Sequence, residues 1–206
     1  MEKQKIYVLH SASVIGMLGP ETETIENKIC AQCAIVELPF QYKNVHLYLD
    51  SWNAEDLIQS GNLFLVSDQL KVALTNHAIK GCAFEKIEVT KSEYFYSSNV
   101  NQDNLPQYWQ LQITSRCKGP EVWWERIPCG NCDKTKWKIT NAGIVSISVP
   151  FNTDAVPTRK VYFDSWTGED IFYLEDPDVP IITEKFLEIL KQFNCEMNIL
   201  ESDWEN

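Results

Sequence analysis

The feature that most constrains the fold of this chain is a twelve-residue segment that occurs twice. The first copy, LYLDSWNAEDLI, spans Leu47–Ile58, and the second, VYFDSWTGEDIF, spans Val161–Phe172, 114 residues further along. Six of the twelve positions are identical, and four others exchange one apolar residue for another. Two copies at this spacing are too few for a solenoid. The repeat therefore predicts two pseudo-symmetric lobes that arose by internal duplication.

The similarity continues downstream of each copy. The segments LVSDQLKVAL (Leu65–Leu74) and IITEKFLEIL (Ile181–Leu190) each contain a good helix cap, Ser67 or Thr183, then an acidic residue and apolar residues at helical spacing. The second copy has two additional residues before its helix, around Pro177. The stretches CAFEKIEV and CEMNIL that follow are typical of strands. We therefore expect an α+β fold in which each half contains a strand, an acidic turn, a helix and a strand.

A polar stretch, Tyr96–Gln107, separates the two units and ends in a turn signal. It predicts an N-terminal lobe at residues 1–96 and a C-terminal lobe at residues 97–206. A chain of 206 residues is long enough to bury a sizeable core, so we expect the two lobes to form one compact unit.

Within the repeat, Trp52 and Trp166 are predicted to be core aromatics, and Asp50 and Asp164 are predicted to cap the turn that follows. A catalytic or metal-binding role is the alternative for the other repeated acids. No histidine or basic residue accompanies either set, which argues against that alternative. The repeated acids are Glu55, Asp56, Glu169 and Asp170.

A C-x-x-C pair precedes each copy of the repeat: CAQC contains Cys30 and Cys33, and CGNC contains Cys129 and Cys132. Each C-x-x-C turn presents two thiolates, so two turns complete a tetrahedral zinc site. Gly130 is expected to ease the backbone around the ion. A structural zinc that joins the lobes is favoured over a redox pair, because neither C-x-x-C opens a helix. Structural thiols without a metal are a further alternative.

The remaining cysteines and the histidines indicate no catalytic centre. Cys82, Cys117 and Cys195 are expected to be small buried apolar residues. His10 and His46 border strand-like runs and are expected to be structural. The sequence contains no glycine-rich phosphate loop and no nucleophile elbow. These features favour a binding protein over an enzyme.

The formal net charge is −11, which argues against nucleic acid or an anionic membrane as a partner and favours a basic protein. The repeated acids named above are candidate partner contacts. Trp123 and Trp124 are two more, because adjacent residues of a strand face opposite sides and an exposed tryptophan is a good binding hot spot. No apolar run is long enough for a signal peptide or a membrane span, so we expect a cytoplasmic protein.

Two C-x-x-C motifs separated by roughly a hundred residues, each followed by a W…D(L/I) element and a capped helix, resemble the double-CXXCG motif proteins of bacteria. The resemblance covers nearly the whole chain, although Ala34 and Asp133 replace the glycine that follows each motif. It implies zinc on the four cysteines and an immunity protein that binds a cognate toxin, most readily a nuclease, and blocks its active site. The alternatives are a zinc-ribbon adaptor of transcription or translation and a C-x-x-C redox protein.

Overall fold

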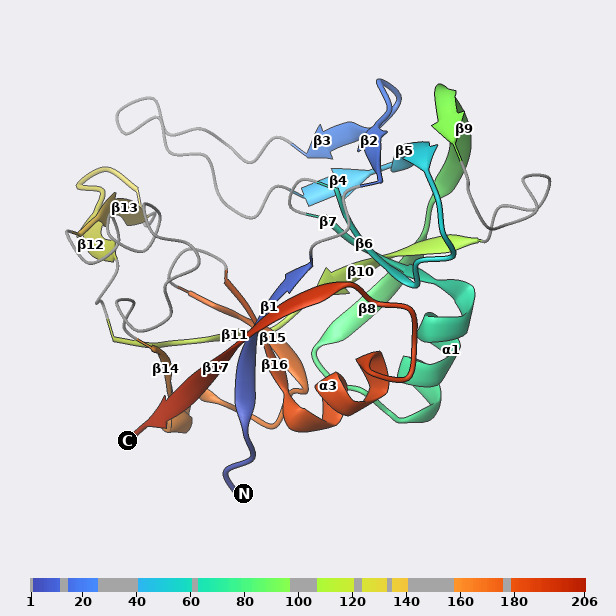
Figure 1. Cartoon of the computed structure of the whole chain (residues 1–206). Helices are drawn as coiled ribbons and strands as arrows, with labels where there is room; N and C mark the ends of the chain where they lie inside the picture. Colours follow the sequence, from blue (N-terminus) through green and yellow to red (C-terminus); the bar gives the residue numbers. More distant parts are fainter. Residues whose placement is uncertain are drawn as a thin grey trace.

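The computed structural model describes residues 2–11, 15–25, 41–60, 63–96, 107–120, 124–132, 135–140, 158–175 and 179–206. Over these residues the protein is mostly β-sheet, with two α-helices (Figure 1). The first half contains β1 (Ile6–Ser11), β2 (Gly16–Leu18), β3 (Glu23–Ile25), β4 (Gln41–Lys43), β5 (His46–Ser51), β6 (Leu57–Ser60), β7 (Leu63–Ser67), α1 (Asp68–Asn76), β8 (Cys82–Lys86) and β9 (Glu88–Tyr96).

The second half contains a similar series of elements. They are β10 (Tyr108–Ile113), β11 (Arg116–Cys117), β12 (Trp124–Pro128), β13 (Thr135–Ile139), β14 (Arg159–Tyr162), the 3-10 turn η2 (Phe163–Ser165), β15 (Ile171–Leu174), β16 (Val179–Thr183), α3 (Glu184–Leu190) and β17 (Met197–Glu205). The predicted mixture of strands and helices is confirmed at this level.

Both helices begin where the sequence predicts. The Ser67 hydroxyl accepts a hydrogen bond from the Leu70 amide (3.2 Å), and the Thr183 hydroxyl accepts one from the Phe186 amide (3.4 Å). These bonds satisfy amides that have no partner within the helix. Before each helix the chain also forms a hairpin, β6–β7 or β15–β16, which the sequence reading did not separate from the acidic turn. Among the described residues, no helix is long and apolar enough to cross a membrane.

The strands form two larger sheets and several small ones. One sheet has the order β11-β15-β16-β1-β17-β14, and another has the order β6-β7-β10-β8. A third sheet, β2-β5-β9, shares a buried cluster with β6 and β7 of the second sheet, and β3-β4 and β12-β13 are two-stranded. Helices α1 and α3 contact each other and lie on the same side of the molecule (Figure 1).

Each half contributes one strand to the sheet of the other half. Strand β1, from the start of the chain, lies between β16 and β17, whereas β10 lies between β7 and β8. Figure 1 shows β1, drawn in blue, beside the red and orange strands of the C-terminal half. The division at residues 96 and 97 stays a prediction, and hydrogen-bonded sheets cross it in both directions.

The pairing registers of the two sheets match residue for residue. The hairpins pair Leu57 with Val66 and Ile171 with Ile182, which are equivalent positions of the two repeats. The exchanged strands β1 and β10 also pair at equivalent positions. Tyr108 pairs with the helix cap Ser67, and Ile6 pairs with the helix cap Thr183. On the opposite edge of each exchanged strand, Leu111 pairs with Phe84 and Leu9 pairs with Ile199.

The buried side chains of the described residues form three clusters that follow this exchange. The central cluster contains residues from both halves, including Leu57, Leu74, Ile171 and Leu190. The second cluster combines the first repeat with Tyr108 of β10, and the third combines the second repeat with Ile6 and Val8 of β1. Trp52 and Trp166 are buried in these two outer clusters, which confirms them as core aromatics.

Candidate functional site

The described part of the chain contains one of the two predicted cysteine pairs. Cys129 and Cys132 are half-buried in the turn that follows β12, and Pro128 pairs with Thr135 across the hairpin. Cys30 and Cys33 lie outside the described residues, in the segment 26–40. That segment starts and ends at paired strands, because Ile25 of β3 pairs with Gln41 of β4. Among the described residues, the structure thus shows only the second C-x-x-C motif, in the turn after β12.

The hairpin turn fits half of a four-cysteine zinc site, since it offers two thiols three residues apart. Among the described residues, no group of three or more His, Cys, Asp or Glu side chains could hold a metal ion. Gly130 is not needed for steric reasons. A Cβ at this position would meet no atom within 4 Å, and its backbone is not left-handed. The expected role of Gly130 in easing the turn has no support.

The other thiols are poor nucleophiles. Burial raises the pKa of Cys82 to about 11 and the pKa of Cys117 and Cys195 to about 12, and nearby carboxylates add to the shift. The thiol form therefore dominates at neutral pH, and the thiolate is the form that reacts or binds metal. Cys117 is fully buried, as expected, whereas Cys82 and Cys195 are half-buried against the central cluster.

Glu55 and Glu169 cap the turn that follows each repeated tryptophan. The Asn53 amide donates to the Glu55 carboxylate (2.6 Å), and the Thr167 amide donates to the Glu169 carboxylate (3.1 Å). The sequence reading assigned this role to Asp50 and Asp164. That prediction is wrong, because the carboxylate that accepts from the turn amide belongs to the residue two positions later, Glu55 or Glu169.

Asp56 and Asp170 each bond to the other half of the chain. The Asp56 carboxylate accepts from the Asn194 amide (3.0 Å), in the loop after α3. The Asp170 carboxylate accepts from the Lys80 amide (3.0 Å), in the loop after α1. The same aspartates accept hydrogen bonds from the cap hydroxyls Ser67 and Thr183. We call these two arrangements the aspartate clasps.

Partner contact by these four acids stays a prediction, and their geometry gives each of them a structural task. Asp170 is only 4% exposed and also pairs with Lys185 (3.1 Å), which leaves little of its carboxylate for a partner. Trp123 lies outside the described residues. Trp124 begins β12, and its side chain is not described.

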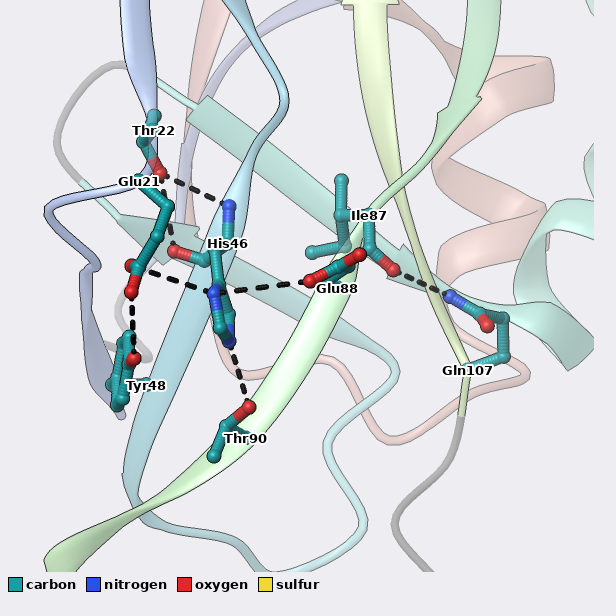
Figure 2. Close-up of polar contacts among 8 residues, drawn as sticks. All are labelled: Glu21, Thr22, His46, Tyr48, Ile87, Glu88, Thr90 and Gln107. Carbon is teal, nitrogen blue, oxygen red and sulfur yellow. Dashed lines mark hydrogen bonds and ion pairs between the residues drawn. The ribbon is translucent and has the colours of Figure 1, made fainter.

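A polar cluster that the sequence reading did not identify surrounds His46 on the sheet β2-β5-β9 (Figure 2). The ring Nε2 lies 2.7 Å from the Thr90 hydroxyl, and Nδ1 lies 3.4 Å from Glu21 and 3.9 Å from Glu88. Tyr48 stacks on the ring at 4.6 Å and donates its hydroxyl to Glu21 (3.2 Å).

The alternation of polar and apolar residues in HLYLDS (His46–Ser51) was the one sequence signal that pointed to this cluster. It places His46 and Tyr48 on one face of β5, while Leu47 and Leu49 are buried on the other. Glu21 and Glu88 come from other strands and loops, so no local pattern could associate them with His46. Both ring nitrogens have partners, and this arrangement holds the ring in a fixed position. The burial of Tyr48 and its hydrogen bond to Glu21 raise the pKa of its phenol.

No protein-family model matches this chain, and no curated protein matches it significantly. The charge and the surfaces of the molecule are therefore the guide to its function.

Proposed function

We propose that this chain is an immunity protein that acts in the cytoplasm by binding, without catalysis. Its partner is a cognate toxic effector with a basic active-site cleft, most readily a nuclease, and the complex blocks that cleft. The observation that carries the proposal is the net charge of −11 on a chain of 206 residues. A field of this sign attracts a cleft that evolved to bind phosphates and accelerates association with it.

We further infer that the two halves arose by duplication and are joined by a structural zinc. The duplication is supported by the matched strand registers and by the reciprocal aspartate clasps. The zinc is supported by the two C-x-x-C motifs of the sequence, the second of which lies in the turn after β12. Its ligands would be Cys30, Cys33, Cys129 and Cys132.

The inhibitor function is tested with the effector domain encoded beside this chain, prepared as a catalytically inactive variant. Isothermal titration calorimetry should show a 1:1 complex, and the active effector should lose its activity at equimolar inhibitor. Binding should weaken as salt rises, because a charged interface is screened. A purified chain that neither binds nor inhibits this effector contradicts the proposal.

The zinc is tested by elemental analysis of the purified protein. One zinc ion per chain should be present, and Cys129→Ser should release it, whereas Cys82→Ser should retain it. Cys82 is the matched control because it is a half-buried thiol outside both C-x-x-C motifs. A metal-free chain that reduces a disulfide substrate would instead support the redox alternative.

A further inference from the structure

We infer that the basic partner docks on the outer face of the sheet β2-β5-β9, around His46; this inference rests on the proposed function. The face consists of Met17, Glu21, His46, Tyr48, Glu88 and Thr90, and we call it the His46 face. Figure 2 shows all of these residues except Met17. The inward side chains of the same central strand are buried, so the outward ones are not needed for the core.

The face combines an apolar contact with exposed negative charge. Met17 is 68% exposed and pairs with Tyr48 across β2 and β5, so the two side chains lie on the same side of the sheet. The Glu88 side chain is 85% exposed, and its residue pairs with His46 on the next strand. Met17 on β2 and Glu88 on β9 thus flank the ring groups of the central strand β5, and protein interfaces commonly combine apolar and charged residues in this way.

The ring groups at the centre are already ordered. His46 is stacked on Tyr48, and the hydroxyls of Tyr48 and Thr90 hold Glu21 and the imidazole in place. Gly19 allows this packing, because a Cβ there would lie 2.4 Å from the Tyr48 ring. Side chains that are fixed before binding lose little conformational entropy in the complex.

At the equivalent positions of the other half, a lysine takes the place of the histidine. Lys160 pairs with Asp203 as His46 pairs with Glu88, and Tyr162 pairs with Glu205 as Tyr48 pairs with Thr90. There Lys160 binds Glu205 at 2.7 Å.

In the second face, Lys160 therefore offsets one of the two carboxylates beside it, those of Asp203 and Glu205. The His46 face instead places Glu21 and Glu88 around a histidine, and both carboxylates are exposed. Charge complementarity therefore assigns a partner surface rich in lysine and arginine to the His46 face rather than to its counterpart.

The two halves supply a matched pair of variants for the test. Glu88→Lys and Asp203→Lys make the same change of charge at equivalent strand positions. The partner is the inactive effector domain encoded beside the chain, and circular dichroism melting checks the fold of each variant. We expect Glu88→Lys to weaken binding by about 10- to 100-fold and Asp203→Lys by less than about threefold.

A second pair tests the apolar contact. Met17→Ala should weaken binding by about 5- to 20-fold, whereas Val72→Ala, an exposed apolar residue on α1, should leave it unchanged.

The possible outcomes distinguish a failure of the proposed docking face from a failure of the proposed function. A wild-type chain that does not bind the effector overturns both. Tight binding that Glu88→Lys and Asp203→Lys weaken equally keeps the function and overturns the His46 face as the docking site. A dimer of the free chain that Met17→Ala dissociates, with effector binding unchanged, would assign the face to a second copy instead.

Discussion

The two repeated turns lie at equivalent places in the fold but are held in different ways. In the second half, the Trp166 indole N–H donates directly to the Glu169 carbonyl at 2.9 Å. In the first half, the Trp52 indole donates to the Tyr108 hydroxyl at 2.9 Å, and that hydroxyl donates in turn to the Glu55 carbonyl. Because Tyr108 lies on the exchanged strand β10, the first turn depends on the other half of the chain. Two copies of the same sequence repeat can thus form different hydrogen bonds at equivalent positions.

The largest expected effect on stability comes from a substitution in β1, the strand that the first half contributes to the sheet of the second half. Ile6→Ala removes a fully buried side chain of β1 from the outer cluster of the C-terminal half. We expect a loss of about 3 kcal/mol in the free energy of unfolding, measured by urea denaturation. Hydrogen exchange should increase most in β16 and β17. An increase confined to the first 96 residues would contradict the structural role assigned to β1.

The aspartate clasps come next and compare the two halves directly. Asp170→Ala removes the acceptor of the Lys80 amide and the ion-pair partner of Lys185, so we expect a loss of about 2–3 kcal/mol. Asp56→Ala should cost less, about 1–2 kcal/mol, because no lysine pairs with it among the described residues.

Asp164→Ala is the control for the clasps, since Asp164 is exposed and is repeated as faithfully as the other acids. It should leave the urea midpoint unchanged. A cost at Asp164 comparable to that at Asp170 would restore the capping role that the sequence suggested for it.

A smaller effect of opposite sign is expected at Gln110. This residue is buried, and its Oε1 has no hydrogen-bond partner among the described residues. The matching position of β1 holds Val8, which is buried in an apolar cluster. Gln110→Met should therefore raise the free energy of unfolding by about 1 kcal/mol. A destabilised variant would contradict this prediction. It would mean that the contacts of the Gln110 amide stabilise the fold by more than the free-energy cost of burying the amide.

The smallest effect is expected at the turn itself. Ala54 has φ 63° and Gly168, at the equivalent position, has φ 103°. A left-handed backbone disfavours any residue with a Cβ, so Ala54→Gly should stabilise the protein by about 0.5–1 kcal/mol. The reverse change, Gly168→Ala, should destabilise it, and thermal unfolding of the two variants gives both signs in one experiment.

Local signals in the sequence determined the parts of the fold that depend on neighbouring residues. The helix caps Ser67 and Thr183, the burial of the repeated tryptophans and the strands after the helices are all found where they were predicted. These features depend on capping, apolar spacing and strand propensity, which act over a few residues. The repeat was visible as well, because it is a similarity between two short segments of the chain.

Only the tertiary structure decided which half each strand joins. At equivalent positions β1 reads IYVLHS and β10 reads YWQLQI, and only Leu9 and Leu111 are identical. The sequence of such a strand is compatible with either sheet. The helices, the aspartate clasps and the central cluster bring both halves together and so decide which sheet each strand joins. The same is true of the His46 face, whose residues come from segments that meet only when β2, β5 and β9 pair. Strand pairing and burial act between distant residues, and no pattern along the chain records them.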